Sequence, residues 1–311
     1  MPVLRETLLT MSRSDRLKDL VTRLPVSSGL VSRFVAGEDT DDAVRVSRSL
    51  VEQGLHVTLD HLGEDTTDIE HATAVADAYL TVLGRLADAG LTSGTEVSVK
   101  LSAVGQALPG DGEKIALDNA LQICAAARTA GTTVTLDMED HTTTDSTLAI
   151  AREVRRDFSD TGVVLQSYLR RTESDCRELA YEGSRVRLCK GAYNEPDTVA
   201  FRSTRDVDKS YVRCLKALMS GAGYPMIATH DPRLIDIAGA LAVQHDRAQG
   251  TYEYQMLYGV RPEEQRRLAA SGEVMRVYVP YGQDWYGYLV RRLAERPANV
   301  QFFLRALATR S

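Results

Sequence analysis

The sequence predicts a (β/α)8 barrel, in which eight parallel strands close into a cylinder and helices cover its outside. Short β-branched runs alternate with segments of helical periodicity from residue 56 to residue 295. The length of 311 residues is ordinary for one such barrel. Polar residues also stand at the end of each run, and barrel active sites gather at the carboxyl ends of the strands. These three observations together favour a barrel that carries an active site.

Eight runs rich in apolar and β-branched residues are the expected strands. They are His56–Asp60, Glu96–Leu101, Val134–Asp137, Val163–Gln166, Val186–Lys190, Met226–Thr229, Tyr252–Gln255 and Met275–Val279. A doubly wound sheet is the alternative arrangement, but such a sheet normally uses fewer strands. We therefore expect the eight runs to form a closed barrel.

Segments with helical periodicity lie between these runs. They are Ile69–Ala89, Lys114–Ala130, Ser146–Arg155, Asp208–Met219, Leu234–Val243 and Pro262–Ala270. Two further helical patterns, at 12–26 and 38–53, precede the repeat and predict an N-terminal helical segment over residues 1–50. No low-complexity linker interrupts the chain, so we expect one domain over residues 1–311.

The last expected helix, Tyr288–Glu295, has a polar face. Tyr288, Arg291, Arg292 and Glu295 follow the i, i+3, i+4, i+7 spacing that brings side chains to one side of a helix. Adjacent arginines can bind a carboxylate through two parallel hydrogen bonds each. The alternative is a solvated helix face on which Glu295 pairs with Arg291.

Composition and motifs exclude several classes of protein. Apolar residues make up 43% and charged residues 26% of the chain, as in soluble globular proteins. A net charge of −6 argues against nucleic acid as a partner. No apolar run approaches the roughly 18 residues of a membrane helix, so no stable membrane insertion is expected. The histidines lack ligand spacing, so we expect no metal. Free cysteines and the lack of a signal peptide indicate the cytoplasm.

Five segments together resemble the proline dehydrogenase family. They are Val99–Ser102, Arg187–Tyr193, Ala228–Asp231, Glu253–Gly259 and Tyr288–Glu295, which occur in strand order. The size and the N-terminal helices resemble the monofunctional bacterial form. The resemblance implies a distorted (βα)8 barrel that holds FAD, with its eighth helix over the barrel mouth. It also implies oxidation of L-proline to 1-pyrroline-5-carboxylate, by hydride transfer from C5 of the ring to flavin N5.

The resemblance implies nine residues around the substrate: Lys100, Asp137, Tyr193, Leu257, Tyr278, Tyr288, Arg291, Arg292 and Glu295. The arginine pair would bind the substrate carboxylate, and Tyr193 and Leu257 would form walls of the pocket. Glu295 would either pair with an arginine or receive the proline amine. A salt bridge with Asp137 is the structural alternative for Lys100. A tyrosine at position 288 goes with proline in the resembled family, whereas a smaller polar residue goes with 4-hydroxyproline.

A second set is implied for FAD: Gln166, Arg187, Lys190, Gly191, Ala192, Arg202, Thr204, Thr229 and His230. In this reading Arg187 lies near flavin N5 and Gln166 hydrogen-bonds the flavin ring. Thr229 and His230 would lie near the pyrophosphate and ribose, and either Thr204 or Arg202 near the FAD tail. The structural alternative for Arg187 is an ion pair with Glu139 or Asp137.

Two other functions compete with this interpretation. Lys100 or Lys190 could form a Schiff base in a barrel lyase or aldolase. The protein could also be a catalytically silent protein that binds flavin or an amino acid. For the dehydrogenase, we expect a membrane quinone as electron acceptor, with peripheral contact at the inner membrane face.

Overall fold

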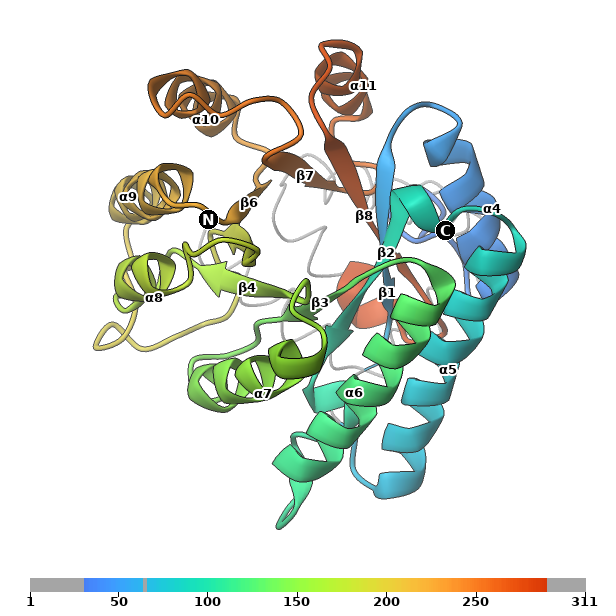
Figure 1. Cartoon of the computed structure of the whole chain (residues 1–311). Coiled ribbons are helices and arrows are strands. Elements are labelled where there is room, and N and C mark those ends of the chain that lie inside the picture. The colour runs from blue at the N-terminus through green and yellow to red at the C-terminus, as the bar shows by residue number, and fades with distance from the viewer. Residues whose placement is uncertain (1–30, 64–65, 290–311) are drawn as a thin grey trace, which may run out of the picture.

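The computed structural model describes residues 31–63 and 66–289 of the chain. Eight parallel strands close into a barrel in chain order, and β8 pairs back onto β1. The strands are β1 His56–His61, β2 Thr95–Lys100, β3 Val134–Asp137, β4 Gly162–Gln166, β5 Arg185–Cys189, β6 Tyr224–Ala228, β7 Glu253–Leu257 and β8 Met275–Tyr281. The predicted barrel and its eight strands are therefore confirmed (Figure 1).

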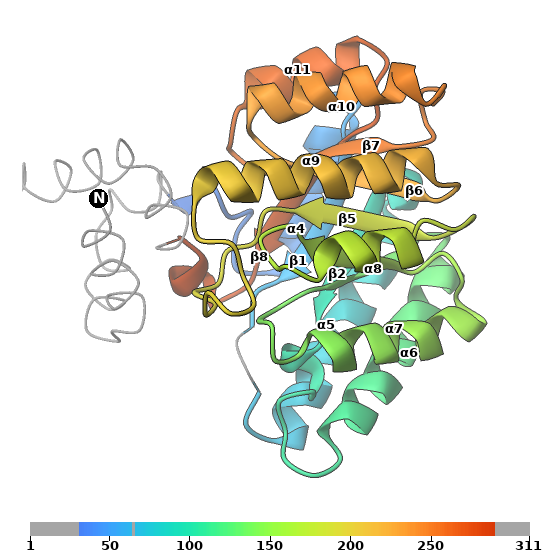
Figure 2. The same ribbon diagram turned by 90° about the vertical axis from the view of Figure 1, so that its left-hand side faces the viewer.

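Helices surround the strands on the outside of the barrel, as two perpendicular views show (Figure 1 and Figure 2). They are α4 Thr40–Val51, α5 Ile69–Asp88, α6 Gly112–Ala130, α7 Thr144–Asp157, α8 Thr172–Glu178, α9 Thr204–Ser220, α10 Pro232–Gln244 and α11 Pro262–Ala270. Two short 3-10 helices, η1 Thr92–Gly94 and η2 Ser102–Val104, flank β2. Neighbouring strands are thus joined by the crossover connections that a parallel sheet requires.

The expected helices agree with the structure in all but one of the described connections. The six helices predicted between strands are confirmed, and the pattern at 38–53 corresponds to α4. The sequence reading missed α8, because seven residues are too few to show helical periodicity. The pattern at 12–26 lies outside the described residues. Residues 285–289 are helical, and the remainder of the expected helix at 288–295 lies outside them.

Local sequence signals fix where several helices begin. Asp39, Asp68 and Asp231 precede α4, α5 and α10, and each carboxylate accepts a hydrogen bond from a backbone N–H of the first turn. Such caps satisfy donors that have no partner within the helix. Pro232 and Pro262 stand at the starts of α10 and α11, where the missing proline N–H costs nothing.

The strands place apolar residues outside and polar residues inside the barrel. On β2, Val97 and Val99 belong to the hydrophobic core beneath the helices. Their neighbours Glu96, Ser98 and Lys100 bond to side chains of other strands across the barrel interior. Successive side chains of a strand point to opposite faces, so this alternation follows directly from the sequence. The barrel interior is therefore lined with charged and hydroxyl groups.

The main hydrophobic core lies between the sheet and the surrounding helices. Tyr79, Leu83 and Leu86 of α5 are fully buried there, as are Tyr211 and Leu215 of α9. Among residues 31–63 and 66–289, no helix combines the length and apolarity needed to cross a membrane. The packed outer layer holds the strands rigidly, so the polar side chains inside the barrel have fixed positions.

Candidate active site

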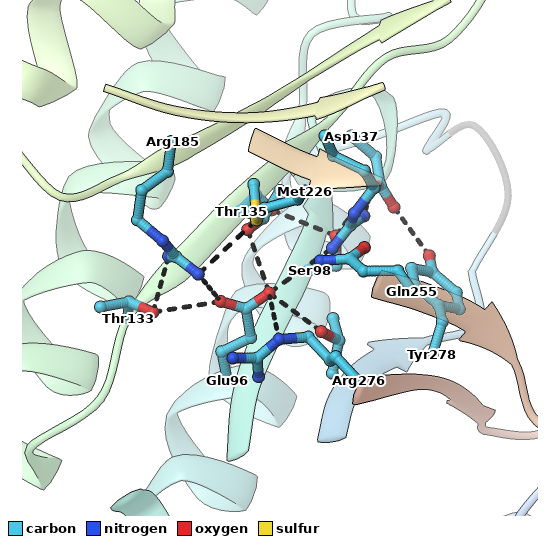
Figure 3. Close-up of polar contacts among 12 residues, drawn as sticks. Glu96, Ser98, Thr133, Thr135, Asp137, Arg185, Met226, Gln255, Arg276 and Tyr278 are labelled. Carbon is cyan, nitrogen blue, oxygen red and sulfur yellow. Dashed lines mark hydrogen bonds and ion pairs between the residues drawn. The ribbon is translucent and has the colours of Figure 1, made fainter. Parts of the chain in front are cut away.

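An ion-pair network fills the amino-terminal end of the barrel. We call Glu96, Arg185, Glu253 and Arg276 the floor cluster, because each stands at the start of its strand. Glu96 Oε2 lies 2.7 Å from Arg185 Nη2, and Glu253 Oε1 lies 2.8 Å from Arg276 Nε. Burial alone would raise the pKa of Glu96, but Arg276, Arg185 and Arg187 outweigh it and hold that pKa well below its usual value. The floor cluster is therefore ionised, and Figure 3 shows Glu96 between Arg185 and Arg276.

The next layer up centres on Asp137, at the carboxyl end of β3. Arg187 Nη1 donates to its Oδ1 across 2.7 Å, and the Tyr278 hydroxyl donates to its Oδ2 across 2.7 Å. Ser98 Oγ also donates to Oδ1 at 2.8 Å. Burial and the Asp137 carboxylate raise the pKa of Tyr278 well above its ordinary value, so the phenol keeps its proton. Side chains of three other strands, β2, β5 and β8, therefore donate hydrogen bonds to the Asp137 carboxylate, and Figure 3 shows Asp137 with Tyr278 and Ser98.

Arg187 also has hydrogen-bonding capacity that the described residues do not use. Its side chain is 5% exposed, and Nε and Nη2 lie buried without a hydrogen-bond partner in the described part of the chain. Nη2 lies 3.5 Å from Glu96 Oε1, which is an ion-pair contact without a hydrogen bond. Buried donors are rarely left unpaired, because each costs about 1–3 kcal/mol. This donor set fits a bound group that accepts hydrogen bonds, as a flavin ring does.

Lys100 pairs with Asp60 rather than with Asp137. Its Nζ lies 2.5 and 2.6 Å from the two carboxylate oxygens of Asp60, which is 1% exposed. Asp137 is the register partner of Lys100 on β3, but its oxygens already accept from Arg187, Tyr278 and Ser98. Burial alone would lower the pKa of Lys100, yet the carboxylates of Asp60 and Asp137 raise it. Lys100 is thus a cation held by a buried counter-ion.

Asp60, Lys100, Asp137, Arg187 and Tyr278 form what we call the mouth cluster. Two cations face two carboxylates, so the cluster carries no net charge when all four groups are ionised. The ion pair between Arg187 and Asp137, which was the structural alternative for Arg187, is confirmed. Glu139 instead accepts hydrogen bonds from the backbone and hydroxyl of Ser102. A balanced cluster suits a substrate that carries one charge of each sign.

Lys190, at the end of β5, is fixed by two carboxylates. Its Nζ lies 2.6 Å from Asp208 Oδ1 and 3.3 Å from Asp231 Oδ2. Arg233 bonds the same two carboxylates and, with Lys190, lowers the pKa of Asp231 to about 2 against the opposing effect of burial. This network joins β5 to the starts of α9 and α10. It gives Lys190 a supporting position and no freedom to act as a nucleophile.

The segment after β5 makes close contact with the loop after β4. Gly191 has a φ of +106°, and a Cβ at this position would lie 2.3 Å from the ring of Tyr168. Ala192 is exposed, and Tyr193 is 41% exposed at the barrel rim. Gln166 is buried and donates from Nε2 to the carbonyl of Glu139 at 2.6 Å. These residues therefore share one sector of the rim, above β3, β4 and β5.

On the other side of the rim, the end of β6 meets the end of β7. The backbone N–H of Leu257 donates to His230 Nε2 across 2.9 Å. Thr229 is buried, and its hydroxyl accepts from the backbone N–H of Asp231 at 3.2 Å. The structure thus brings three of the predicted site residues together: Thr229, His230 and Leu257.

Arg202 and Thr204 lie beyond the rim. Both are exposed, and Thr204 is the first residue of α9. Arg202 Nη1 donates to Asn194 Oδ1 at 3.2 Å, which links it to the segment after β5. Arg202 lies just before α9 and Thr204 at its start, whereas the other predicted cofactor residues lie on or directly after a strand.

The predicted polar face of the eighth helix falls only partly within the described residues. Arg291, Arg292 and Glu295 lie outside them. Tyr288 is buried in a small hydrophobic cluster apart from the main core. The members of this cluster are Phe34, Val35, Leu62, Trp285, Tyr286, Tyr288 and Leu289. The start of the eighth helix therefore packs against the segments before α4 and after β1.

Sequence reasoning missed several residues that shape the site: Asp60 as the partner of Lys100, and all four members of the floor cluster. A signal for them exists in the alternation of the strands, for example Glu96-Val97-Ser98-Val99-Lys100. Charged or polar residues that alternate with valine along a strand predict a polar barrel interior. No metal-binding group of three or more His, Cys, Asp or Glu side chains occurs in the part of the chain that the structure describes.

A closed parallel barrel with ionised side chains at the carboxyl ends of its strands defines a (βα)8-barrel enzyme. Residues 43–305 match the sequence profile described as Proline dehydrogenase, and the chain belongs to the proline dehydrogenase family. It is similar to Proline dehydrogenase 1 of Bacillus subtilis, with 37% identity over 98% of this chain and 99% of the relative. Proline dehydrogenase of Deinococcus radiodurans is 38% identical over 97% of each chain.

Among solved structures, the fold is similar to proline utilization A from Bdellovibrio bacteriovorus, which was inactivated by N-propargylglycine. The TM-score is 0.78 and the sequence identity 26%, over 85% of this chain. This chain spans only 32% of that larger protein. The match confirms the barrel architecture predicted from the sequence.

Proposed function

We propose that this protein oxidises L-proline to 1-pyrroline-5-carboxylate with FAD as its cofactor, as the first step of proline catabolism. FAD, when bound, supplies the acceptor for the hydride that leaves C5 of the proline ring. Membership of the proline dehydrogenase family supports the reaction. The observation that carries the site is Arg187, a buried guanidinium with two unused donors among acidic and aromatic neighbours. A cation there would favour the reduced, anionic form of the cofactor.

Most of the proposed cofactor residues lie on or directly after β4, β5 and β6, whereas Arg202 and Thr204 lie beyond the rim. Arg187 and Gln166 would face the flavin ring, and Thr229 and His230 the pyrophosphate and ribose. Lys190, Gly191 and Ala192 would support the cofactor from the end of β5. Arg202 or Thr204 would lie near the FAD tail. In this arrangement the backbone at Gly191 can approach a ligand closely, because no Cβ intervenes.

The proposed substrate residues come from the mouth cluster and from the eighth helix. They are Lys100, Asp137 and Tyr278 of the mouth cluster, and Tyr288, Arg291, Arg292 and Glu295 of the helix, with Tyr193 and Leu257 as walls. Arg291 and Arg292 would bind the proline carboxylate. Lys100 stays protonated beside Asp60, and Tyr278 keeps its proton at the phenol oxygen. Asp137 remains a pure acceptor between Arg187 and Tyr278. These fixed protonation states suit a zwitterionic substrate.

The geometry does not favour the Schiff-base alternative. A lysine nucleophile must lose its proton, which requires a lowered pKa. Instead, Asp60 and Asp137 raise the pKa of Lys100, and two carboxylates bind Lys190.

The absorbance of the purified protein tests the proposal. A flavin spectrum that L-proline bleaches under anaerobic conditions is the expected result. A flavin spectrum that no amino acid bleaches would indicate a silent binding protein. A colourless protein that borohydride traps with a carbonyl substrate would indicate the Schiff-base chemistry. N-propargylglycine, which inactivated the Bdellovibrio relative, should abolish the activity here as well.

The electron acceptor is a further part of the proposal. We expect a membrane quinone, reached by peripheral contact of a cytoplasmic protein with the inner membrane face. The test is proline-dependent reduction of a short-chain quinone, together with sedimentation of the protein with anionic vesicles before and after addition of proline. Turnover with a soluble dye alone would contradict the choice of acceptor.

A further inference from the structure

Glu195 joins the loops that follow three neighbouring strands. Its Oε1 accepts hydrogen bonds from the backbone N–H of His141 at 2.9 Å and from the Tyr168 hydroxyl at 3.0 Å. Its Oε2 meets the His141 ring at Nδ1. His141 follows β3, Tyr168 follows β4 and Glu195 follows β5. One carboxylate therefore ties together three segments of the barrel rim.

The contact reaches the predicted site through Tyr168. Burial and the Glu195 carboxylate raise the pKa of Tyr168, and the backbone of Tyr193 partly offsets this rise. The ring of Tyr168 lies against Gly191 so closely that a Cβ there would overlap it. The backbone N–H of Tyr168 donates to the carbonyl of Lys190 at 2.9 Å. Glu195 thus fixes Tyr168, and Tyr168 in turn supports the whole run from Lys190 to Tyr193.

Apart from Glu195, this segment is held mainly through its backbone, since Arg170 donates to the carbonyls of Asp197 and Val199. Across residues 191–199, all of which the structure describes, Glu195 is the only buried residue, at 4% exposed. Backbone bonds anchor the end of the segment, where Phe201 N–H donates to the Tyr168 carbonyl at 2.7 Å. A buried side chain in an otherwise exposed loop is a strong constraint on that loop, because its opening would strip the carboxylate of all three contacts.

We propose that Glu195 is a positioning residue that holds the segment Lys190–Tyr193 in its ligand-binding shape. It acts through Tyr168 and His141 and does not itself touch a ligand. The part of this inference that concerns FAD rests on the proposed function. The part that concerns the loop rests only on the contacts above and has its own measurement.

Three variants of the full-length holoprotein test the role. Glu195→Leu keeps most of the volume but removes every acceptor, whereas Glu195→Gln keeps the Oε1 that accepts from His141 and Tyr168. Asp197→Leu is the matched control, since Asp197 is an exposed acid in the same loop. The first measurement is the rate of trypsin cleavage after the exposed Arg202. The second is the dissociation constant of FAD, from the flavin fluorescence released on dilution.

Glu195→Leu should speed cleavage and weaken FAD binding about tenfold or more, as expected for the loss of several hydrogen bonds to a buried charge. With FAD and proline saturating, kcat should stay within about threefold of wild type, because no reacting group is removed. Glu195→Gln should restore most of both properties, and Asp197→Leu should resemble wild type.

Unchanged cleavage and FAD affinity in Glu195→Leu would overturn the proposal, as would equal effects of Asp197→Leu. A loss of kcat at unchanged FAD affinity would also overturn it, since that pattern belongs to a catalytic residue. If wild-type protein binds no FAD, the proposed function fails, while the cleavage measurement still tests Glu195.

Discussion

Arg187 of β5 and Asp137 of β3 are joined across the barrel by a hydrogen bond of 2.7 Å between Nη1 and Oδ1. The pair leaves Arg187 Nε and Nη2 unsatisfied among the described residues. Nη1 therefore fixes the guanidinium to the Asp137 carboxylate, while Nε and Nη2 can donate hydrogen bonds to a ligand. This relationship is the physical basis of the first prediction.

Arg187→Ala should lower the reduction potential of the bound flavin, because a nearby positive charge stabilises the reduced anion. We expect a fall of about 30 mV or more, which for a two-electron couple corresponds to a tenfold change in equilibrium constant. Spectroelectrochemical titration of the FAD-loaded variant measures the potential directly.

Arg185→Ala is the control for this change. Arg185 stands two residues earlier on β5 and points into the same barrel, but it belongs to the floor cluster and pairs with Glu96 at 2.7 Å. If both variants shift the potential equally, the effect comes from a general loss of positive charge and the assignment of Arg187 to the flavin is wrong.

The Lys100–Asp60 pair leads to a prediction about coupling. Lys100→Met and Asp60→Leu should each destabilise the protein by about 3–5 kcal/mol, because each leaves one buried charge without its partner. The double variant removes both charges and should regain much of that stability. Urea denaturation of the four proteins gives the coupling free energy. Losses that simply add in the double variant would mean that the pair is not coupled.

The same double variant separates stability from function. We expect kcat/KM for L-proline to remain low in Lys100→Met and in the double variant, since neither of them retains the Lys100 ammonium. Recovery of activity together with stability would show that the pair only supports the barrel.

The charges of the floor cluster should make the protein sensitive to acid. The arginines hold the pKa of Glu96 below its unfolded value of about 4.3 and, through Arg276, that of Glu253 as well. A group with a depressed folded pKa contributes its full stability above the unfolded pKa and loses it as pH falls toward the folded pKa. The free energy of unfolding should therefore fall below about pH 4.3, by up to about 1.4 kcal/mol per pH unit for each group.

Glu96→Gln isolates one of these groups. The variant should be less stable at pH 7, and its stability should fall less steeply below about pH 4.3 than that of wild type. Glu263→Gln, at a position whose side chain is 88% exposed, should leave the profile unchanged. Identical slopes for Glu96→Gln and wild type would contradict the ionised floor cluster.

The strands could be predicted because each carries a short β-branched run bounded by turn residues. The placement of the site followed from topology, since parallel strands bring their carboxyl ends to one rim. Side-chain partners could not be predicted in the same way. Lys100 and Asp137 are register neighbours, yet Lys100 pairs with Asp60 because Asp137 is already saturated by Arg187, Tyr278 and Ser98. Such competition depends on three-dimensional geometry that no spacing in the chain encodes.

The contacts of Glu195 illustrate the same limit. Its partners His141 and Tyr168 lie 54 and 27 residues away along the chain. An acid between an asparagine and a proline in a polar loop gives no sign that it is buried. By contrast, Gly191 belongs to the segment Arg187–Tyr193, which the sequence comparison with the family singled out. Its positive φ and its close approach to Tyr168 explain why a glycine is needed there.

Tyr288 carries the last prediction, which concerns specificity. If Arg291 and Arg292 hold the carboxylate, the Tyr288 ring one turn earlier should cover the pyrrolidine near C4. A ring packed on a methylene leaves neither room nor a partner for a hydroxyl, which discriminates by about 1–3 kcal/mol, or roughly 10- to 200-fold. Tyr288→Ser should therefore narrow the preference for L-proline over trans-4-hydroxy-L-proline, mainly by loss of proline turnover. The ratio of kcat/KM for the two substrates measures this.

The position of Tyr288 among Phe34, Leu62 and Trp285 means that the substitution also removes packing. Tyr286→Ser is the matched control, because Tyr286 is a buried tyrosine of the same cluster. Both variants should lose stability, but only Tyr288→Ser should change the substrate ratio. Equal ratios in wild type and Tyr288→Ser would show that Tyr288 only packs the helix against the barrel. A changed ratio in Tyr286→Ser would instead mean that the packing of the helix, and not contact of the Tyr288 ring with the substrate, sets the preference.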